Sequence, residues 1–573
     1  MRLPRNTVNY SLLGAMFVVL GALLLYPIWL TTRGAFFTDP AAGRGFTLLN
    51  LRLLTEDPTL YEGLLNSLRV AATTTVIATV LALPLAVLSV KYRYPLKGVF
   101  SALVLVPMIL PPFVGALGFK LIWGREGAVN ALLGTEWDLM GGGRFWGVVI
   151  VQALSLYPIM YLNTTAALAN LDPAMDEAAE SLGAGPLRRF FRITLPLIRP
   201  GLFAGGTIVF IWSLTELGTP LVFDYNRVTP VQIFLGLKEV EASAQPYALT
   251  LVMLTLAIGA YIVGKVLFGQ RGHAMQAKAS RAAGEKTLGP LGALVAVALF
   301  TLVSLAALMP HIGVVLTALA KPGSWYRSVL PAEFTLDHFG QALGSDLASS
   351  SINNSLLLAS MAVGLDLVIG IVVGYLIVRT NIRGRGVLDA LCMLPLAVPG
   401  LVMAFGYVAM SLRWPFGKGD PLEGWVSVLG AQPNPVPLLI AAYAIRRLPY
   451  IVRATVAGLE QTSGQMEEAA LNLGASRFTA IRRVVVPLIA ANLIAGALLA
   501  FSFAMLEVSD SLMLAQQEAN YPMTKAIYTF ANRLADGPYI ASAMGVWGMA
   551  LLTVTLAGAS VLMGRKLGAI FRV

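Results

Sequence analysis

Long apolar segments alternate with short polar segments along almost the whole chain. A bilayer-spanning helix needs roughly 20 apolar residues, because the hydrocarbon core is about 30 Å thick. On that criterion we expect spans near 11–31, 66–90, 98–123, 145–169, 201–223, 247–269, 288–319, 354–378, 387–411, 433–456, 492–516 and 541–565. The pattern therefore predicts an all-α polytopic membrane protein with about twelve transmembrane helices, six in each half.

One polar segment between spans occurs twice. Glu177-Ala178-Ala179 returns as Glu468-Ala469-Ala470, and Gly183 returns as Gly474, in each case 291 positions later. A hydrophobic-Pro step follows each copy, at Leu195-Pro196 and at Val486-Pro487. We therefore expect one structural element to be presented twice, in loops 172–200 and 463–491.

The repeat extends over both halves of the chain. Asn66-Ser67-Leu68 returns as Asn354-Ser355-Leu356, 288 positions later. Because each half has an even number of spans, both should run the same way through the membrane, related by a pseudo-twofold axis along its normal. We assign 1–269 to the first half, 288–573 to the second, and the polar stretch 270–287 to a cytoplasmic linker.

Composition agrees with membrane insertion. Hydrophobic residues make up 57% of the 573 positions and charged residues only 12%, which would leave a soluble protein with far too much apolar surface. The net charge of +11 follows from Lys and Arg, which are about twice as frequent on the side of the N-terminus as on the other side. Both termini are therefore expected in the cytoplasm. Outside the membrane flanks we find no basic run of the kind that binds nucleic acid.

The residues of the repeated loop predict a helix, a glycine turn and a second helix. Gly183 is suited to the left-handed conformation that ends a helix. Pro186 in the first copy and Ser476 in the second are typical of a helix N-terminus. The small side chains of Ala178 and Ala179 would let another surface approach closely. The alternative is an ordinary amphipathic helix lying at the membrane surface.

The two Glu-Ala-Ala…Gly loops resemble those of the membrane permeases of type I ATP-binding-cassette (ABC) importers. In that family the loop is the coupling helix, which docks on a cytoplasmic ATPase subunit. The resemblance implies that Glu177, Ala178, Ala179 and Gly183 face one ATPase copy, and that Glu468, Ala469, Ala470 and Gly474 face another. It also implies a bacterial inner-membrane location in contact with lipid, and an extracytoplasmic solute-binding protein as the further partner.

The chain is expected to be a non-enzymatic subunit with no cofactor of its own. The nearest match to a phosphate-binding loop, Gly259 to Lys265, lies in an apolar span, and Val266 replaces the Ser or Thr that would hold magnesium. The three histidines are scattered, and the single cysteine, Cys392, lies within a span. ATP and magnesium are therefore expected on the partner ATPase.

Ionisable residues within spans are candidates for the gate or the transport path, because each is costly in lipid. Glu216 and Glu507 are expected early in the fifth and eleventh spans, and Asp510 follows one turn later. They could line the gate or only hydrogen-bond between helices. Arg446 and Arg447 could meet an anionic solute or only extend to the cytoplasmic surface. Prolines 107, 111, 112, 395 and 399 should kink the third and ninth spans.

Within the importer permeases, the fused halves and the Arg446-Arg447-Leu448-Pro449-Tyr450 segment are most similar to the ferric iron group. That resemblance implies ferric iron as the solute. Related permeases for phosphonates such as 2-aminoethylphosphonate, thiamine, polyamines or sulfate remain alternatives. A secondary transporter also has twelve spans in two like halves, but it needs neither repeated loop.

Overall fold

The protein is described from a computed structural model, which covers residues 5–39, 43–138, 141, 144–268 and 285–563. Most of the expected linker, 270–287, lies outside these residues. The first half contains α1 (Arg5–Leu20), η1 (Gly21–Leu25), α2 (Tyr26–Gly34), α3 (Leu49–Glu56), α4 (Pro58–Lys91), α5 (Lys97–Leu103), η2 (Val106–Ile109), α6 (Pro112–Trp123), α7 (Ala128–Leu133), α8 (Phe145–Ala169), α9 (Pro173–Ser181), α10 (Pro186–Arg189), η3 (Phe190–Thr194), α11 (Leu195–Leu214), α12 (Gly218–Val222), α13 (Thr229–Leu235), η4 (Gly236–Glu239) and α14 (Gln245–Phe268).

The second half repeats this order. It contains α15 (Pro290–Leu319), α16 (Asp337–Gly344), α17 (Asp346–Arg379), α18 (Arg385–Ala397), α19 (Gly400–Ser411), α20 (Val436–Gln461), α21 (Gln465–Asn472), α22 (Arg477–Ala480), η5 (Ile481–Val485), α23 (Val486–Leu488), α24 (Ala490–Met505), α25 (Ser509–Leu514), η6 (Glu518–Asn520), α26 (Met523–Ala531) and α27 (Gly537–Met563). Two short sheets pair β1 (Phe37–Asp39) with β2 (Arg44–Phe46), antiparallel, and β3 (Tyr92–Arg93) with β4 (Lys286–Thr287), parallel.

The helices confirm an all-α polytopic architecture. In the described residues, eight helices are long and apolar enough to cross a membrane, and three further pairs qualify as spans that are sharply bent. The expected span at 433–456 forms α20, which does not qualify because it carries Arg446, Arg447 and Arg453. Eleven of the twelve expected spans are therefore apolar enough to span the membrane, and the twelfth is a helix of sufficient length.

The expected kinks in the third and ninth spans are confirmed. The helix axis turns by 101° between Ile109 and Pro112, and by 103° between Ala397 and Gly400. Proline lacks an amide hydrogen and clashes with the preceding turn, so it ends the helix at both places. The fifth and eleventh spans end earlier than expected, because α11 ends at Leu214 and α24 ends at Met505.

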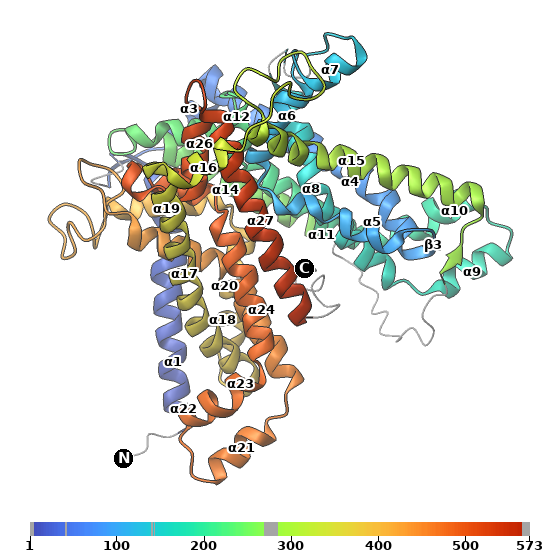
Figure 1. Cartoon of the computed structure of the whole chain (residues 1–573). Helices are drawn as coiled ribbons and strands as arrows, with labels where there is room; N and C mark the ends of the chain where they lie inside the picture. Colours follow the sequence, from blue (N-terminus) through green and yellow to red (C-terminus); the bar gives the residue numbers. More distant parts are fainter. Residues whose placement is uncertain (1–4, 40–42, 139–140, 142–143, 269–284, 564–573) are drawn as a thin grey trace.

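The helices form two legs that diverge from a common loop face, with α15 of the second half along the first leg and α1 of the first half along the second (Figure 1). The first leg contains α4, α8 and α11, and the second contains α17, α20 and α24. Helices α9 and α21 lie at the far ends of the two legs (Figure 1). The largest cluster of buried apolar side chains contains residues of both halves.

The first span of each half packs against the opposite half. Tyr407 of α19 donates a hydrogen bond to the carbonyl of Leu23, and a Cβ on Gly406 would meet the carbonyl of Pro27. In the matching contact, Gly118 of α6 and Gly313 of α15 are so close that a Cβ on either would meet the other's backbone. The two halves are therefore interlocked rather than merely adjacent.

The repeated Asn-Ser pair has a structural role. Ser67 Oγ accepts a hydrogen bond from Thr229 N at 2.9 Å, and Ser355 Oγ accepts one from Met523 N at 2.7 Å. Each serine thereby binds the first residue of a short helix, α13 or α26. Buried amide groups need such partners, so this repeat maintains the loop face.

Candidate coupling helices and buried charge cluster

The repeated loop folds as a helix, a glycine turn and a second helix in both copies. Gly183 has φ +80° and Gly474 has φ +90°, in the left-handed region that glycine adopts at little cost. After the turn, Ala184 N donates to Ala179 O at 2.9 Å, and Ala475 N donates to Ala470 O at 3.1 Å. The predicted local structure of both loops is therefore confirmed. We call residues 172–200 and 463–491 the first and second coupling loops.

The signature residues have the same exposure in the two loops. Glu177 and Ala178 are exposed and Ala179 is half-buried, as are their counterparts Glu468, Ala469 and Ala470. Gly183 and Gly474 are exposed, and no atom lies within 4 Å of a Cβ built on either. Each loop therefore presents an open surface of small side chains at the end of its leg.

The structure adds three apolar pairs that sequence reasoning missed. Met175 and Met466, Leu182 and Leu473, and Leu187 and Phe478 occupy equivalent positions in the two loops, and all six side chains are exposed. Leu182 and Leu473 are 87% and 90% exposed, immediately before the turn glycines. Their 291-residue spacing was the available signal. Matching exposed apolar residues are typical of a surface that another protein covers.

Each coupling loop forms an ion pair with the second membrane span of its half, α4 or α17. Lys91 at the end of α4 forms an ion pair with Asp176 of α9 at 3.4 Å. At the equivalent place, Arg379 of α17 lies 3.9 Å from the Glu467 carboxylate, which also accepts a hydrogen bond from Tyr375 at 2.6 Å. A movement of either loop is thereby linked to a membrane-spanning helix.

The second attachment should be the stronger of the two. Arg379 also donates to the carbonyls of Leu459 and Thr462, at 3.1 and 2.8 Å, so Arg379→Gln breaks several bonds at once. We expect amide hydrogen exchange in α21 to rise several-fold in this variant, and less in α9 for Lys91→Gln, because partly exposed ion pairs contribute at most about 1 kcal/mol. Arg188→Gln, an exposed position, is the control. Equal exchange in all three variants would contradict the attachment.

Arg189 forms an ion pair within the first coupling loop. Its guanidinium binds the carboxylate of Glu180 at 2.6 Å. Lys286 of β4 binds the same carboxylate at 2.6 Å, and these two hydrogen bonds hold the pKa of Glu180 below its usual value. The end of the linker therefore contacts the first coupling loop.

Glu216 lies at a break in the helix, not early in a span. It follows the last turn of α11, which is 20 residues long, or about 30 Å. Its carboxylate accepts hydrogen bonds from Gly218 N at 3.1 Å and Thr219 N at 2.8 Å, which are the first free amides of α12. A carboxylate at a helix N-terminus satisfies these amides, so Glu216 stabilises the break.

Glu507 occupies the equivalent break after α24 but has different partners. Its carboxylate pairs with Arg446 at 2.5 Å and with Arg447. Arg446 also lies 3.4 Å from Asp510, and the Glu507 and Asp510 side chains are 4% and 0% exposed. The expectation that both glutamates would lie early in spans is therefore wrong, since both follow the helices that the coupling loops begin.

One of the two roles expected for Arg446 and Arg447, extension to the cytoplasmic surface, does not match the structure. They do not extend to the surface, because their side chains are 21% and 13% exposed and are paired within the protein. Arg446 lies against Gly400 at the bend between α18 and α19. The first half has Ser155 and Leu156 at the equivalent positions. The buried charge cluster, which we define as Arg446, Arg447, Glu507 and Asp510, therefore belongs to the second half alone.

Asp366 is a further buried acid that sequence reasoning missed. It lies in α17, is 0% exposed, and neither carboxylate oxygen has a hydrogen-bond partner in the described structure. A lone aspartate in the middle of an apolar span was the signal that could have identified it.

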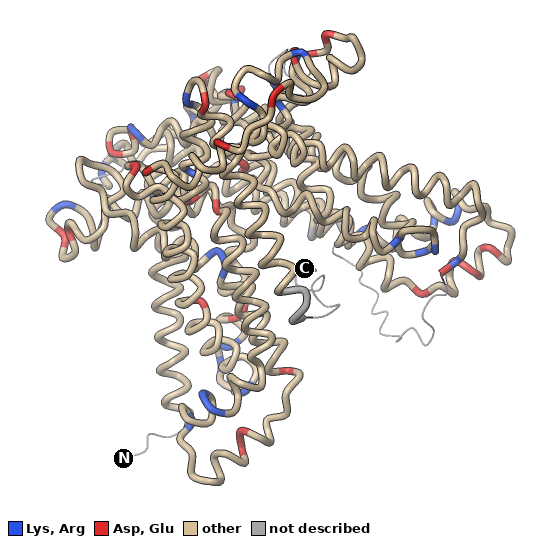
Figure 2. The backbone as a smooth tube through the Cα atoms, viewed as in Figure 1, with Lys and Arg blue, Asp and Glu red and all other residues tan. Residues whose placement is uncertain are grey.

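The two helix breaks meet at the junction of the halves. A Cβ on Gly218, two residues after Glu216, would lie 3.2 Å from the side chain of Val508 and 2.6 Å from Phe113. The legs are joined near this contact and diverge towards the coupling loops (Figure 1). Figure 2 shows other charged residues gathered at the loop face and at the far ends of the legs. Glu216 lies two residues before α12, which is at the loop face (Figure 1).

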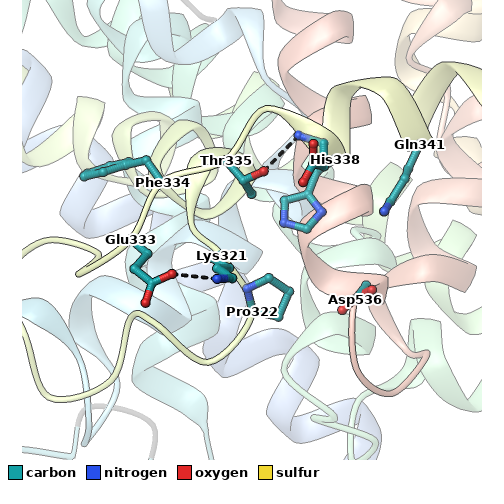
Figure 3. Close-up of a pocket in the computed structure, with 9 residues that line it drawn as sticks. Lys321, Pro322, Glu333, Phe334, Thr335, His338, Gln341 and Asp536 are labelled. Carbon is teal, nitrogen blue, oxygen red and sulfur yellow. Dashed lines mark hydrogen bonds and ion pairs between the residues drawn. The ribbon is translucent and has the colours of Figure 1, made fainter.

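A polar pocket of about 350 Å³ lies among the loops beside α16. Figure 3 shows Lys321 and Glu333 pointing towards each other, and their ion pair measures 2.7 Å. His338 stacks on Tyr539 with 5.3 Å between ring centroids, and its Nε2 lies 3.1 Å from the carbonyl of Ala320. Lys321 and Glu333 thus neutralise each other, and one ring nitrogen of His338 is paired with the backbone.

The chain is similar in sequence to the permease proteins of several bacterial transport systems. Residues 75–268 and 366–562 match the family of binding-protein-dependent transport system inner membrane components. The ferric transport system permease protein FbpB of Actinobacillus pleuropneumoniae is 27% identical over 492 residues, covering 83% of this chain and 67% of that protein. The putative ferric transport system permease protein FbpB 1 of Haemophilus influenzae is 27% identical over 493 residues, covering 81% and 72%. The molybdenum transport system permease protein ModB of Escherichia coli is 26% identical over 212 residues, covering 36% and 93%.

Proposed function

The chain belongs to the family of binding-protein-dependent transport system inner membrane components and is the permease of an ABC importer, and we propose that its solute is ferric iron. The supporting observation is the similarity to two ferric permeases over more than four fifths of the chain. A molybdenum permease is similar to this chain at 26% identity, so identity of this order does not by itself define the solute. Phosphonate, thiamine, polyamine and sulfate are therefore the alternatives that the test must separate from iron.

We further propose that α9 and α21 each dock on one copy of a cytoplasmic ATPase. Their matching geometry, their exposed apolar pairs and their positions at the leg ends support this role. Glu177, Ala178, Ala179 and Gly183 then contact one copy, and Glu468, Ala469, Ala470 and Gly474 contact the other. ATP and magnesium belong to that partner. This placement puts both termini in the cytoplasm of a bacterial cell and the loop face outside.

The loop face is the proposed landing surface of an extracytoplasmic solute-binding protein. It comprises the loops near 32–65, 124–144, 321–353 and 412–432, on the face opposite the proposed ATPase contacts. Exposed aromatic side chains at Trp137, Trp414 and Trp425 are suited to a protein interface. The buried charge cluster, together with Glu216, then forms the gate nearest this face.

Solute uptake should require the binding protein. We expect cells with the permease, ATPase and binding protein to accumulate radiolabelled ferric iron, and cells without the binding protein to show at least tenfold less uptake. Mass spectrometry of the purified binding protein identifies its solute independently. If a different solute co-purifies with the binding protein, the proposal of iron is wrong, but the role of the chain as an importer permease still holds. Strong uptake by vesicles without any binding protein would instead indicate a secondary transporter.

A further inference from the structure

An apolar groove of about 580 Å³ runs between α17 and α24 in the second leg. Gly364, Leu367 and Ile371 line one wall, and Leu493, Ala497 and Phe501 line the other. The groove lies within the size range of ligand sites, roughly 300–1,000 Å³. Gly364 makes it deeper, because no atom lies within 4 Å of a Cβ built there.

The groove opens to the lipid and has the length of one leaflet. Val368 and Ile494 beside it are 65% and 49% exposed, as expected for side chains that face the bilayer. Its wall on α17 runs from Ser360 to Ile371, or about 16 Å of helix. Half of a 30 Å hydrocarbon core is about 15 Å, so the groove matches a single acyl chain in length.

Two arginines lie at the end of the groove nearer to α21. Val486 lines the groove, and Arg482 and Arg483 precede it by about one helical turn. Both side chains are exposed, and neither forms an ion pair with another described residue. Guanidinium groups bind phosphate oxygens well, so these arginines are placed to meet a lipid headgroup.

The first half lacks both features. The position of Gly364 is taken there by Val76, whose side chain carries two methyl groups where glycine has none, and the position of Arg482 is taken by Phe191. Arginines at the membrane surface are common, but they do not explain why the half with two adjacent arginines is also the half with the open space at Gly364. The two differences therefore point to one ligand that has an acyl chain and a negative charge.

We propose that this groove is a binding site for one anionic phospholipid. The acyl chain lies along Gly364, Leu367 and Ile371, and the phosphate contacts Arg482 and Arg483. The site is independent of the transported solute. It lies on the helix that begins at the second coupling loop, so an occupied groove would brace α24 against α17.

The test is lipid retention by the purified full-length chain. In native mass spectrometry, we expect phosphatidylglycerol to be retained about 10- to 30-fold more tightly than phosphatidylcholine, because each nearby arginine favours an anionic headgroup. Arg482→Gln with Arg483→Gln should reduce phosphatidylglycerol to the level of phosphatidylcholine. Gly364→Leu should abolish retention of both lipids by filling the notch.

The first half provides matched controls. Val76 and Arg192 are the first-half counterparts of Gly364 and Arg483. The variants Val76→Leu and Arg192→Gln should leave lipid retention unchanged. A monodisperse chromatographic peak with an unchanged helical spectrum shows that each variant is folded. If Gly364→Leu folds but retains phosphatidylglycerol like the parent, or if the two lipids bind equally, the proposal is wrong.

Discussion

Replacing Glu507 with Gln is expected to destabilise the permease strongly, whereas the same change at Glu216 should have little effect. Glu507 is the shared carboxylate of two largely buried arginines, and its loss leaves Arg447 without an ion-pair partner. Removing one member of a buried ion pair typically costs about 3–5 kcal/mol. Glu216 binds only two backbone amides, and the amide oxygen of Gln can still accept one of these bonds.

Thermal unfolding of both variants in lipid nanodiscs measures this difference. If the cluster also holds the gate closed, Glu507→Gln should raise the ATPase activity of the complex in the absence of solute. The double variant Glu507→Gln with Arg447→Gln should recover part of the stability, because it removes the buried charge that the single change leaves unpaired. Equal unfolding temperatures for Glu507→Gln and Glu216→Gln would show that the ion pairs do not maintain the fold.

Replacing Gly183 and Gly474 with Val is expected to uncouple ATP hydrolysis from solute delivery. Both glycines have positive φ, a conformation that costs other residues about 1–2 kcal/mol and β-branched residues more. No atom lies within 4 Å of a Cβ at either position, so the backbone conformation of the turn is what the change should disturb. We expect most of the solute-stimulated ATPase activity to be lost while membrane insertion stays normal.

Gly185 provides a matched control for the first loop. It lies two residues from Gly183, also has open space around a Cβ, and has φ −64° and ψ 161°, which suit valine. Gly185→Val should therefore retain coupling. Gly183→Asn should retain more activity than Gly183→Val, because asparagine tolerates the left-handed region. Normal stimulation in the double valine variant would rule out the proposed role of the turns.

The sequence determined the features that depend on local chemistry. Spans follow from hydropathy, because a chain in lipid must satisfy its backbone groups within its own helices. Both glycine turns and the bends at Pro111 and Pro399 follow from residues whose backbone preferences act within one turn of chain. For the same reason, the helix–glycine–helix structure of both coupling loops could be predicted from the repeated segment.

Only the tertiary structure decided which distant groups meet. Arg446 and Glu507 are 61 positions apart, and hydropathy could not show that they form an ion pair rather than face a solute or the surface. Glu216 follows the end of α11, where its carboxylate accepts hydrogen bonds from the free amides of α12. Glu507 follows the end of α24, where its carboxylate pairs with two arginines. The interlocked first spans depend on the close approach of Gly118 to Gly313, which requires both helices in place. Which residues meet across a long sequence separation depends on how the whole chain packs, so these contacts cannot be predicted from a local sequence pattern.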